Sequence, residues 1–261
     1  MTLIVDEVML REPNLLIPGK KPVGMPKIDW SHPLSNKLKF YLWQRGPLLL
    51  NLVDNSIMYR LPDSVATVVT SVDTEGEYFY FSTATTATGA IGVANYSPLT
   101  SSDGSGTGDF CVLYSGSINT ASQITRIIYQ RRNVSPYIHW GINGNDATSG
   151  YLNFYLYNGG VDSNVTMAGA IDNNEHVYIC QRKGSDLEIY KDGIIGATAG
   201  GSTKDFLTAS QDFTIGHYLI SGAGAYPNLG DQRFYAGWDR SLSSGEIKSM
   251  TADPYQFLIP A

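Results

Sequence analysis

The stretch Tyr151-Leu-Asn-Phe-Tyr-Leu-Tyr157 alternates strictly between apolar residues and residues that suit a surface. Successive side chains of a strand point to opposite faces, so Leu152, Phe154 and Leu156 share one face. The other face carries Asn153 together with the tyrosines. This pattern predicts an antiparallel strand that is buried on one face and open to a surface on the other.

Strand-like segments recur on both sides of this stretch at short intervals, with turn-forming residues between them. Asp192-Gly193 separates residues 187–191 from Ile194-Ile195 and predicts a two-residue hairpin turn. The composition agrees, because Gly 27, Pro 12 and Tyr 17 accompany only 16% charged residues. The expected strands span residues 65–72, 77–82, 110–115, 123–130, 137–142, 151–157, 177–182, 187–191, 213–218 and 233–238.

One helix is expected, close to the C-terminal end. Ser243 can cap its first turn, and Glu246 three residues later completes a capping box. Ile247 and Met250 form its apolar side, and Pro254 ends it. No long helices separate the strands, which disfavours parallel topology. We therefore expect an all-β, two-sheet antiparallel sandwich in a single domain.

Charge and cysteine content narrow the class of partner. The net charge of -6 disfavours nucleic acid, since duplex-binding domains are usually basic. Cys111 and Cys180 lie far apart in apolar segments, so we expect buried free thiols and neither a zinc site nor a disulfide framework. The N-terminal sequence lacks a cationic leader, and no apolar run approaches the roughly 18 residues that cross a bilayer. We expect no signal peptide and no membrane partner.

Residues 1–27 differ in character from the rest of the chain. Pro13, Pro18, Pro22 and Pro26 recur every four or five residues, and proline lacks an amide donor and fixes φ. We expect an extended arm whose apolar residues pack along its own domain or on a neighbouring subunit. The globular domain is then expected at residues 28–261.

Six short motifs, in order along residues 28–258, together resemble the laminin-G-like, concanavalin A-like jelly roll of the phage and metagenomic type. The resemblance implies a lectin- and glucanase-related sandwich and a protein of a phage particle. Two departures from the family pattern are Cys111 in place of threonine and Lys191 in place of valine. The motifs are Asp29–Leu34 (DWSHPL), Gly108–Phe110 (GDF), Leu187–Gly193 (LEIYKDG), Phe213–Gly216 (FTIG), Trp238–Ser243 followed by Glu246-Ile247, and Asp253–Gln256 (DPYQ).

Scaffold roles account for these motifs, and we expect the protein not to be an enzyme. Glucanases of this fold use carboxylates on one strand, and Asp73, Glu75 and Glu77 could share a face. However, Gly76 indicates a turn, and the spacing differs from the glucanase pattern. Glycoside hydrolysis is therefore the weakest of three functional hypotheses.

We expect no catalytic site and no metal centre among the remaining polar residues. No nucleophile motif accompanies any of the four histidines, and no two histidines have the spacing of metal ligands. We therefore expect structural roles for them. Some laminin-G-like domains hold calcium, and Asp103 to Asp109 forms an acidic loop, but two carboxylates are few for this hard cation. The four histidines are His32, His139, His176 and His217.

Tyrosines on the surface side of the strands are the candidate contacts for a ligand. Tyr155 and Tyr157 face away from the apolar side of residues 151–157, and we expect Tyr178 to do likewise. Aromatic surfaces bind sugar rings and also protein partners. An ordinary sandwich surface with exposed tyrosines is the alternative interpretation.

The leading hypothesis from the sequence is a structural protein of the virion, synthesised in the host cytoplasm. Capsid decoration is its most concrete form, anchored to other capsid or tail proteins through residues 1–27, with multivalency adding affinity. The alternative is a glycan-binding module of a tail or surface appendage, which would use the candidate tyrosines. A homo-oligomer is compatible with both hypotheses.

Overall fold

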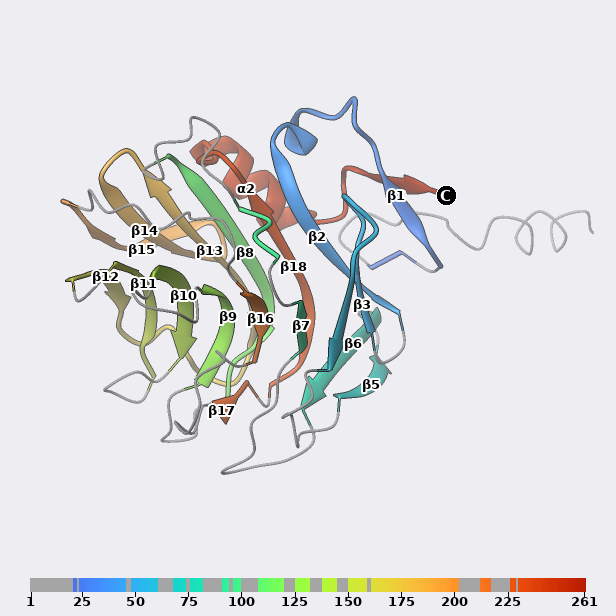
Figure 1. Cartoon of the computed structure of the whole chain (residues 1–261), viewed down its shortest axis with the longest axis horizontal. Helices are drawn as coiled ribbons and strands as arrows, with labels where there is room; N and C mark the ends of the chain where they lie inside the picture. The colour runs from blue at the N-terminus through green and yellow to red at the C-terminus, as the bar shows by residue number, and fades with distance from the viewer. Residues whose placement is uncertain are drawn as a thin grey trace, which may run out of the picture.

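The computed structural model of the chain describes fifteen stretches, and the predictions made for the other residues lie outside it (Figure 1). Most of the N-terminal arm, the loop at residues 101–107 and His217 fall there. The described residues are 21–22, 24–45, 48–60, 68–73, 76–81, 91–93, 96–99, 108–119, 125–131, 138–144, 150–158, 161–201, 212–216, 226–228 and 230–261.

The first sheet is antiparallel and holds the longest strands. A β-hairpin of two further strands, β5 and β6, joins it where Phe79 pairs with Gln232. In spatial order the sheet runs β15 (Ile194–Ala199), β14 (Asp186–Lys191), β13 (Glu175–Lys183), β8 (Phe110–Ser117), β18 (Gln232–Trp238), β2 (Leu38–Arg45) and β3 (Leu48–Asn51), with the hairpin formed by β5 (Val68–Asp73) and β6 (Gly76–Phe81).

The second sheet packs face to face with the first and is also antiparallel, apart from the short parallel pair β17–β9. Strand β4 pairs with β3 of the first sheet and with β7 of the second, so it links the two layers. The order is β12 (Val161–Met167), β11 (Leu152–Asn158), β10 (Ile138–Gly144), β9 (Thr125–Arg131), β16 (Asp212–Ile215), β7 (Ile91–Val93) and β4 (Ile57–Arg60), with β17 (Tyr226–Pro227) beside β9.

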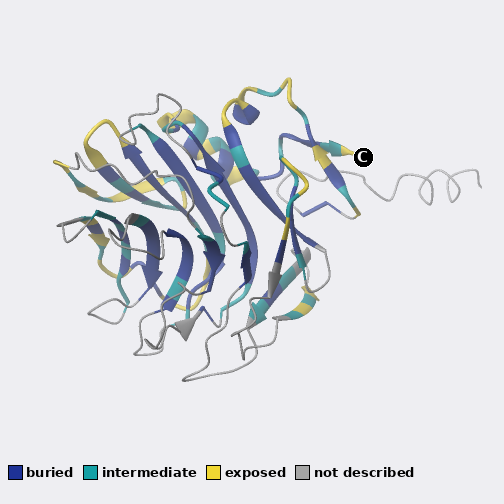
Figure 2. Cartoon of the chain, viewed as in Figure 1, coloured by how far each residue is buried: buried dark blue, intermediate teal, exposed yellow. Residues whose placement is uncertain are grey.

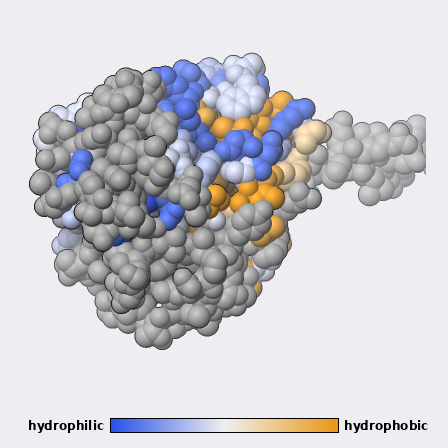
Figure 3. All heavy atoms as spheres, viewed as in Figure 1, coloured by the Kyte–Doolittle hydropathy of each residue, from blue (hydrophilic) through white to orange (hydrophobic). Residues whose placement is uncertain are grey.

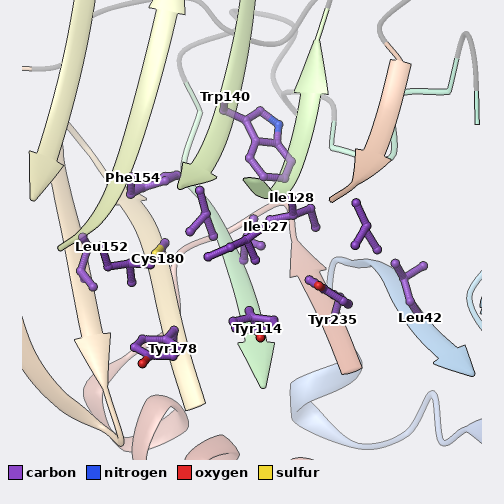
Figure 4. Close-up of a cluster of buried hydrophobic side chains, with 14 of the residues drawn as sticks. Leu42, Tyr114, Ile127, Ile128, Trp140, Leu152, Phe154, Tyr178, Cys180 and Tyr235 are labelled. Carbon is purple, nitrogen blue, oxygen red and sulfur yellow. The ribbon is translucent and has the colours of Figure 1, made fainter. Parts of the chain in front are cut away.

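Apolar side chains from both sheets fill the space between them (Figure 4), and Figure 2 shows the central strands of both sheets coloured as buried. Trp140 and Phe154 reach in from the second sheet and both contact Phe110 of the first, with ring centroids 5.7 Å apart in each pair. Phe40 of β2 packs on Phe213 of β16 at 4.9 Å. Burial of this area is the main force that holds the two sheets together.

A second apolar cluster covers the outer face of the first sheet. Helix α2 (Ser244–Ala252), the 3-10 turn η1 (Pro33–Ser35) and the strand pair β1 (Pro26–Ile28) with β19 (Leu258–Pro260) lie over it. Figure 3 shows apolar residues near the surface on the side of β1, where Leu52 and Val53 are half-buried against this cluster. Strands of this sheet are thus buried on both faces, which explains the unbroken apolar run of β8.

The predicted fold class is confirmed: the chain is an antiparallel β-sandwich with one short α-helix among its described residues. Asp192 and Gly193 have φ values of 52° and 77°, as a two-residue hairpin of this type requires. Ser243 caps α2, and the capping box with Glu246 is present. Within the described residues, no helix is long and apolar enough to cross a membrane.

The described end of the N-terminal arm packs on its own domain. Strand β1 pairs with β19 and contains Pro26 and Lys27, so it spans the expected boundary between arm and domain. The ammonium group of Lys21 lies 4.8 Å from the ring centroid of Trp43. Residues 1–20 lie outside the described part, so a contact between them and a neighbouring subunit stays a prediction.

Cys111 and Cys180 are buried free thiols, as expected. They lie in different clusters, Cys180 between the two sheets and Cys111 under α2. Burial raises the pKa of both thiols, which keeps them protonated. Their roles are therefore those of small apolar side chains.

Candidate ligand-binding face

The outer face of the second sheet carries a group of aromatic side chains on three adjacent strands. Cross-strand register places His139 of β10 opposite Tyr157 of β11, and Gly141 of β10 between Tyr129 of β9 and Tyr155 of β11. We call Tyr129, His139, Tyr155 and Tyr157 the aromatic face. Leu156 and the other inward residues of β11 anchor it from below, because alternate positions are buried.

The rings of the aromatic face pack on one another in a fixed order. His139 stacks on Tyr157 with ring centroids 4.8 Å apart and an interplanar angle of 23°. The edge of Tyr155 meets His139 at 5.3 Å and Tyr129 at 5.8 Å. Such offset and edge-to-face contacts are favourable for aromatic pairs, so the rings hold one another in place.

Gly141 makes room for the Tyr129 ring. A Cβ at this position would lie 2.5 Å from Cε1 of Tyr129, which no packed side chain tolerates. The Tyr129 ring is fully buried, and its hydroxyl oxygen accepts a hydrogen bond of 2.7 Å from Nη1 of Arg126. Tyr129 therefore forms the floor of the aromatic face, while Tyr155 and Tyr157 are half-buried at its surface.

The pKa of His139 is strongly shifted by its surroundings on this face. Burial lowers its pKa to about 3, and the positive charges of Arg131 and Arg126 act in the same direction. The ring is consequently neutral near pH 7. Its Nδ1 atom is buried and makes no hydrogen bond, so no acceptor stabilises a proton on it.

Two of the three predicted site residues lie together on this face. Tyr155 and Tyr157 point outward, as the alternation of residues 151–157 predicts. The outward orientation expected for Tyr178 is wrong. Tyr178 is 1% exposed and lies between the sheets, stacked on Tyr114 at 6.0 Å, and its hydroxyl donates to the Ala170 carbonyl at 2.8 Å (Figure 4).

The sequence analysis missed His139, Tyr129 and the two arginines. A signal was present in residues 138–144, where His139, Gly141 and Asn143 alternate with Trp140 and the isoleucines. The glycine in the outward series weakened the pattern. Its reason is the close approach of Tyr129, which only the pairing of β9 with β10 reveals.

The acidic residues considered for hydrolysis lie at a hairpin. Strand β5 ends at Asp73, which pairs with Gly76, the first residue of β6, so Gly76 lies at the start of a strand next to the chain reversal. Glu75 and the side chains of Asp73 and Glu77 lie outside the described residues, and their catalytic role remains untested.

The acidic loop considered for calcium is described only at its end. Asp109 accepts hydrogen bonds from the Gly184 amide at 2.7 Å and the Ser241 hydroxyl at 2.8 Å, so it joins three chain segments. Within the described stretches no three residues of the His, Cys, Asp or Glu type gather as a metal site would require.

Two further histidines have structural contacts, in line with expectation. His32 accepts a hydrogen bond from the Leu34 amide at 3.2 Å and packs on Phe257 with centroids 6.2 Å apart. His176 lies between two carboxylates, with Nδ1 2.6 Å from Asp192 and Nε2 2.9 Å from Asp172. These contacts tie loops to the sandwich.

Comparisons with known proteins give a fold but no family. No family model and no curated protein matches the sequence. A binding domain of botulinum neurotoxin serotype D/C matches the structure with a TM-score of 0.59 and 15% identity, over 82% of this chain and 51% of that one. The binding domain of Paraclostridial Mosquitocidal Protein 1 gives 0.58 and 13%, over 82% and 52%.

A third structure, the binding domain of botulinum neurotoxin DC in complex with SialylT, gives a TM-score of 0.55 and 12% identity, over 84% of this chain and 52% of that one. The chain thus spans about half the length of each of these domains. At such low identity the likeness shows the fold alone. The chain shares an all-β sandwich fold with these binding domains.

Proposed function

We propose that this chain is a non-catalytic carbohydrate-binding domain and that the aromatic face is its ligand site. The observation that carries the proposal is the set of rings held on three adjacent strands, with Tyr155 and Tyr157 half-exposed and packed on the His139 ring. The similarity to solved binding domains, one of them complexed with SialylT, supports a binding role.

The chemistry of the face suits a sugar. Aromatic rings cover the apolar C–H faces of a pyranose, and tyrosine hydroxyls offer hydrogen bonds at their edges. Since the rings already pack on one another, little conformational entropy is lost when the ligand binds.

A glycan array followed by titration calorimetry tests this proposal. Tyr155→Ala and Tyr157→Ala should each weaken binding of the selected glycan by at least about tenfold, while Trp30→Ala should bind like wild type. Trp30 is a matched control because it is an aromatic residue that is 58% exposed, in a turn away from the aromatic face.

Equal losses in all three variants would refute the assignment of this face. So would full binding in both tyrosine variants. The selected glycan is also assayed for release of reducing sugar. Turnover that Glu75→Gln abolishes would replace binding by hydrolysis as the function.

A role on a phage particle is a second proposal, and it rests on the motif resemblance and the proline-punctuated arm. The domain would be displayed on the virion, as capsid decoration or on a tail, through the arm. Deletion of residues 1–20 leaves β1 and its pairing with β19 in place, so it tests anchoring without disturbing the sandwich. Unchanged occupancy on particles would refute the arm's role. Copy number by mass spectrometry of virions separates decoration, with hundreds of copies, from an appendage with few.

A further inference from the structure

Among the described residues, strand β5 forms an open edge at the margin of the sandwich (Figure 1). Its described pairing is with β6 alone, and β6 in turn meets the rest of the sheet through the single described pair Phe79 and Gln232. An isolated two-stranded hairpin is marginally stable in water. Two contacts anchor β6 on the sandwich: the buried ring of Phe79, and a hydrogen bond of 3.1 Å from Nε2 of Gln44 to the Tyr78 carbonyl. Strand β5 lies on the outer side of β6.

Up to Val72, the sequence of β5 lacks the features that protect an edge from pairing, and its one charged residue, Asp73, stands at its end. Val68–Val72 reads VVTSV, with high β-propensity and no charge, and its register on β6 is continuous. Val72 is 73% exposed, although it is apolar. Strands with open edges usually carry a charge, a proline or a bulge that blocks addition of another strand.

The two edge strands on the opposite side of the sandwich do carry such features. Strand β12 has the exposed Asn164 at its centre, and asparagine is a residue type that disfavours strand addition. Strand β15 is uncharged, but its register on β14 shifts between Ile189 and Tyr190, which marks a bulge. Of these three edges, β5 is therefore the one left suited to pairing.

We propose that β5 pairs with β5 of a second copy of this chain, antiparallel about a two-fold axis. The product is a four-stranded sheet, β6–β5–β5–β6, that gives each hairpin the neighbour it lacks. A second copy is the occupant because the strand is self-complementary: with the axis at Thr70, Val69 faces Ser71 and no like charges meet. The first charged residue, Asp73, lies beyond the centre of the pairing.

This dimer leaves the aromatic faces free. They lie on β9, β10 and β11 of the second sheet, on the other side of the molecule from β5 in Figure 1. Two ligand faces on one dimer would bind a multivalent surface with higher avidity than one face. Dimerisation itself does not depend on the proposed function.

Charge variants at Thr70 test the pairing by sedimentation equilibrium of the full chain. Thr70 is exposed, so Thr70→Lys and Thr70→Glu should fold normally. Each would place two like charges face to face across the axis, and the dimer dissociation constant should rise at least about tenfold. An equimolar mixture of the two variants should restore the dimer, because lysine then faces glutamate.

Thr198→Lys is the matched control, since Thr198 is an exposed threonine on the edge strand β15. It should dimerise like wild type. Wild type that stays monomeric at all concentrations would overturn the proposal, as would equal dimerisation of Thr70→Lys, failure of the mixture to restore the dimer, or dissociation by Thr198→Lys. Binding of a peptide from another protein to β5, while this chain itself stays monomeric, would also refute the proposal.

Discussion

His139 takes its chemistry from the residues around it. Burial is the largest cause of its lowered pKa, and the nearby guanidinium groups of Arg131 and Arg126 add to it. An imidazolium at this place would lose hydration and meet two like charges. The fold therefore holds the ring neutral, which suits stacking on Tyr157.

This shift predicts a pH dependence of stability. The pKa of His139 is about 3 in the folded chain and 6.5 as its ordinary value. Between these values the unfolded chain binds more protons, so the free energy of unfolding should fall as the pH drops from 6.5 towards 3. Urea unfolding at pH 7 and pH 4 measures this slope. His139→Gln should reduce it, whereas Tyr155→Phe, which keeps the histidine, should retain it. An unchanged slope in His139→Gln would contradict the assignment.

The direction of a single tyrosine is predictable only where its strand has one polar face. Tyr155 and Tyr157 lie in β11, whose alternation of buried and half-buried positions is readable in the sequence. Tyr178 lies in β13, which is buried on both faces from residue 178 to residue 182. There the pairing with Tyr114 of β8 decides which way the ring points, and local sequence does not contain that information.

A few residues determine where helix α2 begins. The Ser243 hydroxyl accepts from the Glu246 amide at 3.3 Å, and Oε2 of Glu246 accepts from the Ser243 amide at 2.9 Å. Hydrogen bonds from Arg240 are the largest cause of the lowered pKa of Glu246, which is about 2. Nε of Arg240 also donates a hydrogen bond to the Asn36 carbonyl. Arg240 therefore joins the first turn of the helix to the segment at Asn36.

Loss of this cap should destabilise the protein measurably. Ser243→Ala leaves the Glu246 amide without its partner and should lower the free energy of unfolding by about 1 kcal/mol. Chemical denaturation followed by circular dichroism checks the value. Ser244→Ala is the control, because it changes the adjacent serine inside the first turn and should have a smaller effect. Equal losses in the two variants would show that the cap contributes nothing specific.

Elements with a clear period were predictable, and those without one were not. The hairpin at Asp192-Gly193 and the strand at residues 151–157 appear where expected. Strand β2, with the sequence LKFYLWQR, was missed because its two apolar faces pack into different clusters and leave no alternation. Strand β12, with the sequence VDSNVTM, was missed because an edge strand exposes polar side chains that resemble a loop.

The whole molecule is organised around the first sheet, which serves two apolar clusters at once. In β8, Val112 and Tyr114 face the second sheet while Cys111 and Leu113 face the outer cluster. Because such a strand packs on both faces, loss of packing in either cluster destabilises the other. The composition predicted a sandwich, but it could not show that one layer has a third layer over it, since that depends on long-range pairing.

This arrangement predicts that damage at the outer cluster unfolds the entire sandwich. Ile247→Ala removes a fully buried side chain of α2 and should cost about 2–5 kcal/mol. The loss should appear in one cooperative transition, with tryptophan fluorescence and circular dichroism giving the same midpoint. Lys248→Ala, at the neighbouring exposed position, should change little. If Ile247→Ala instead separates the two signals, the helix with β1 and β19 would unfold before the sandwich. The first sheet would then not couple the two clusters, and stability between the sheets would be independent of the layer that covers them.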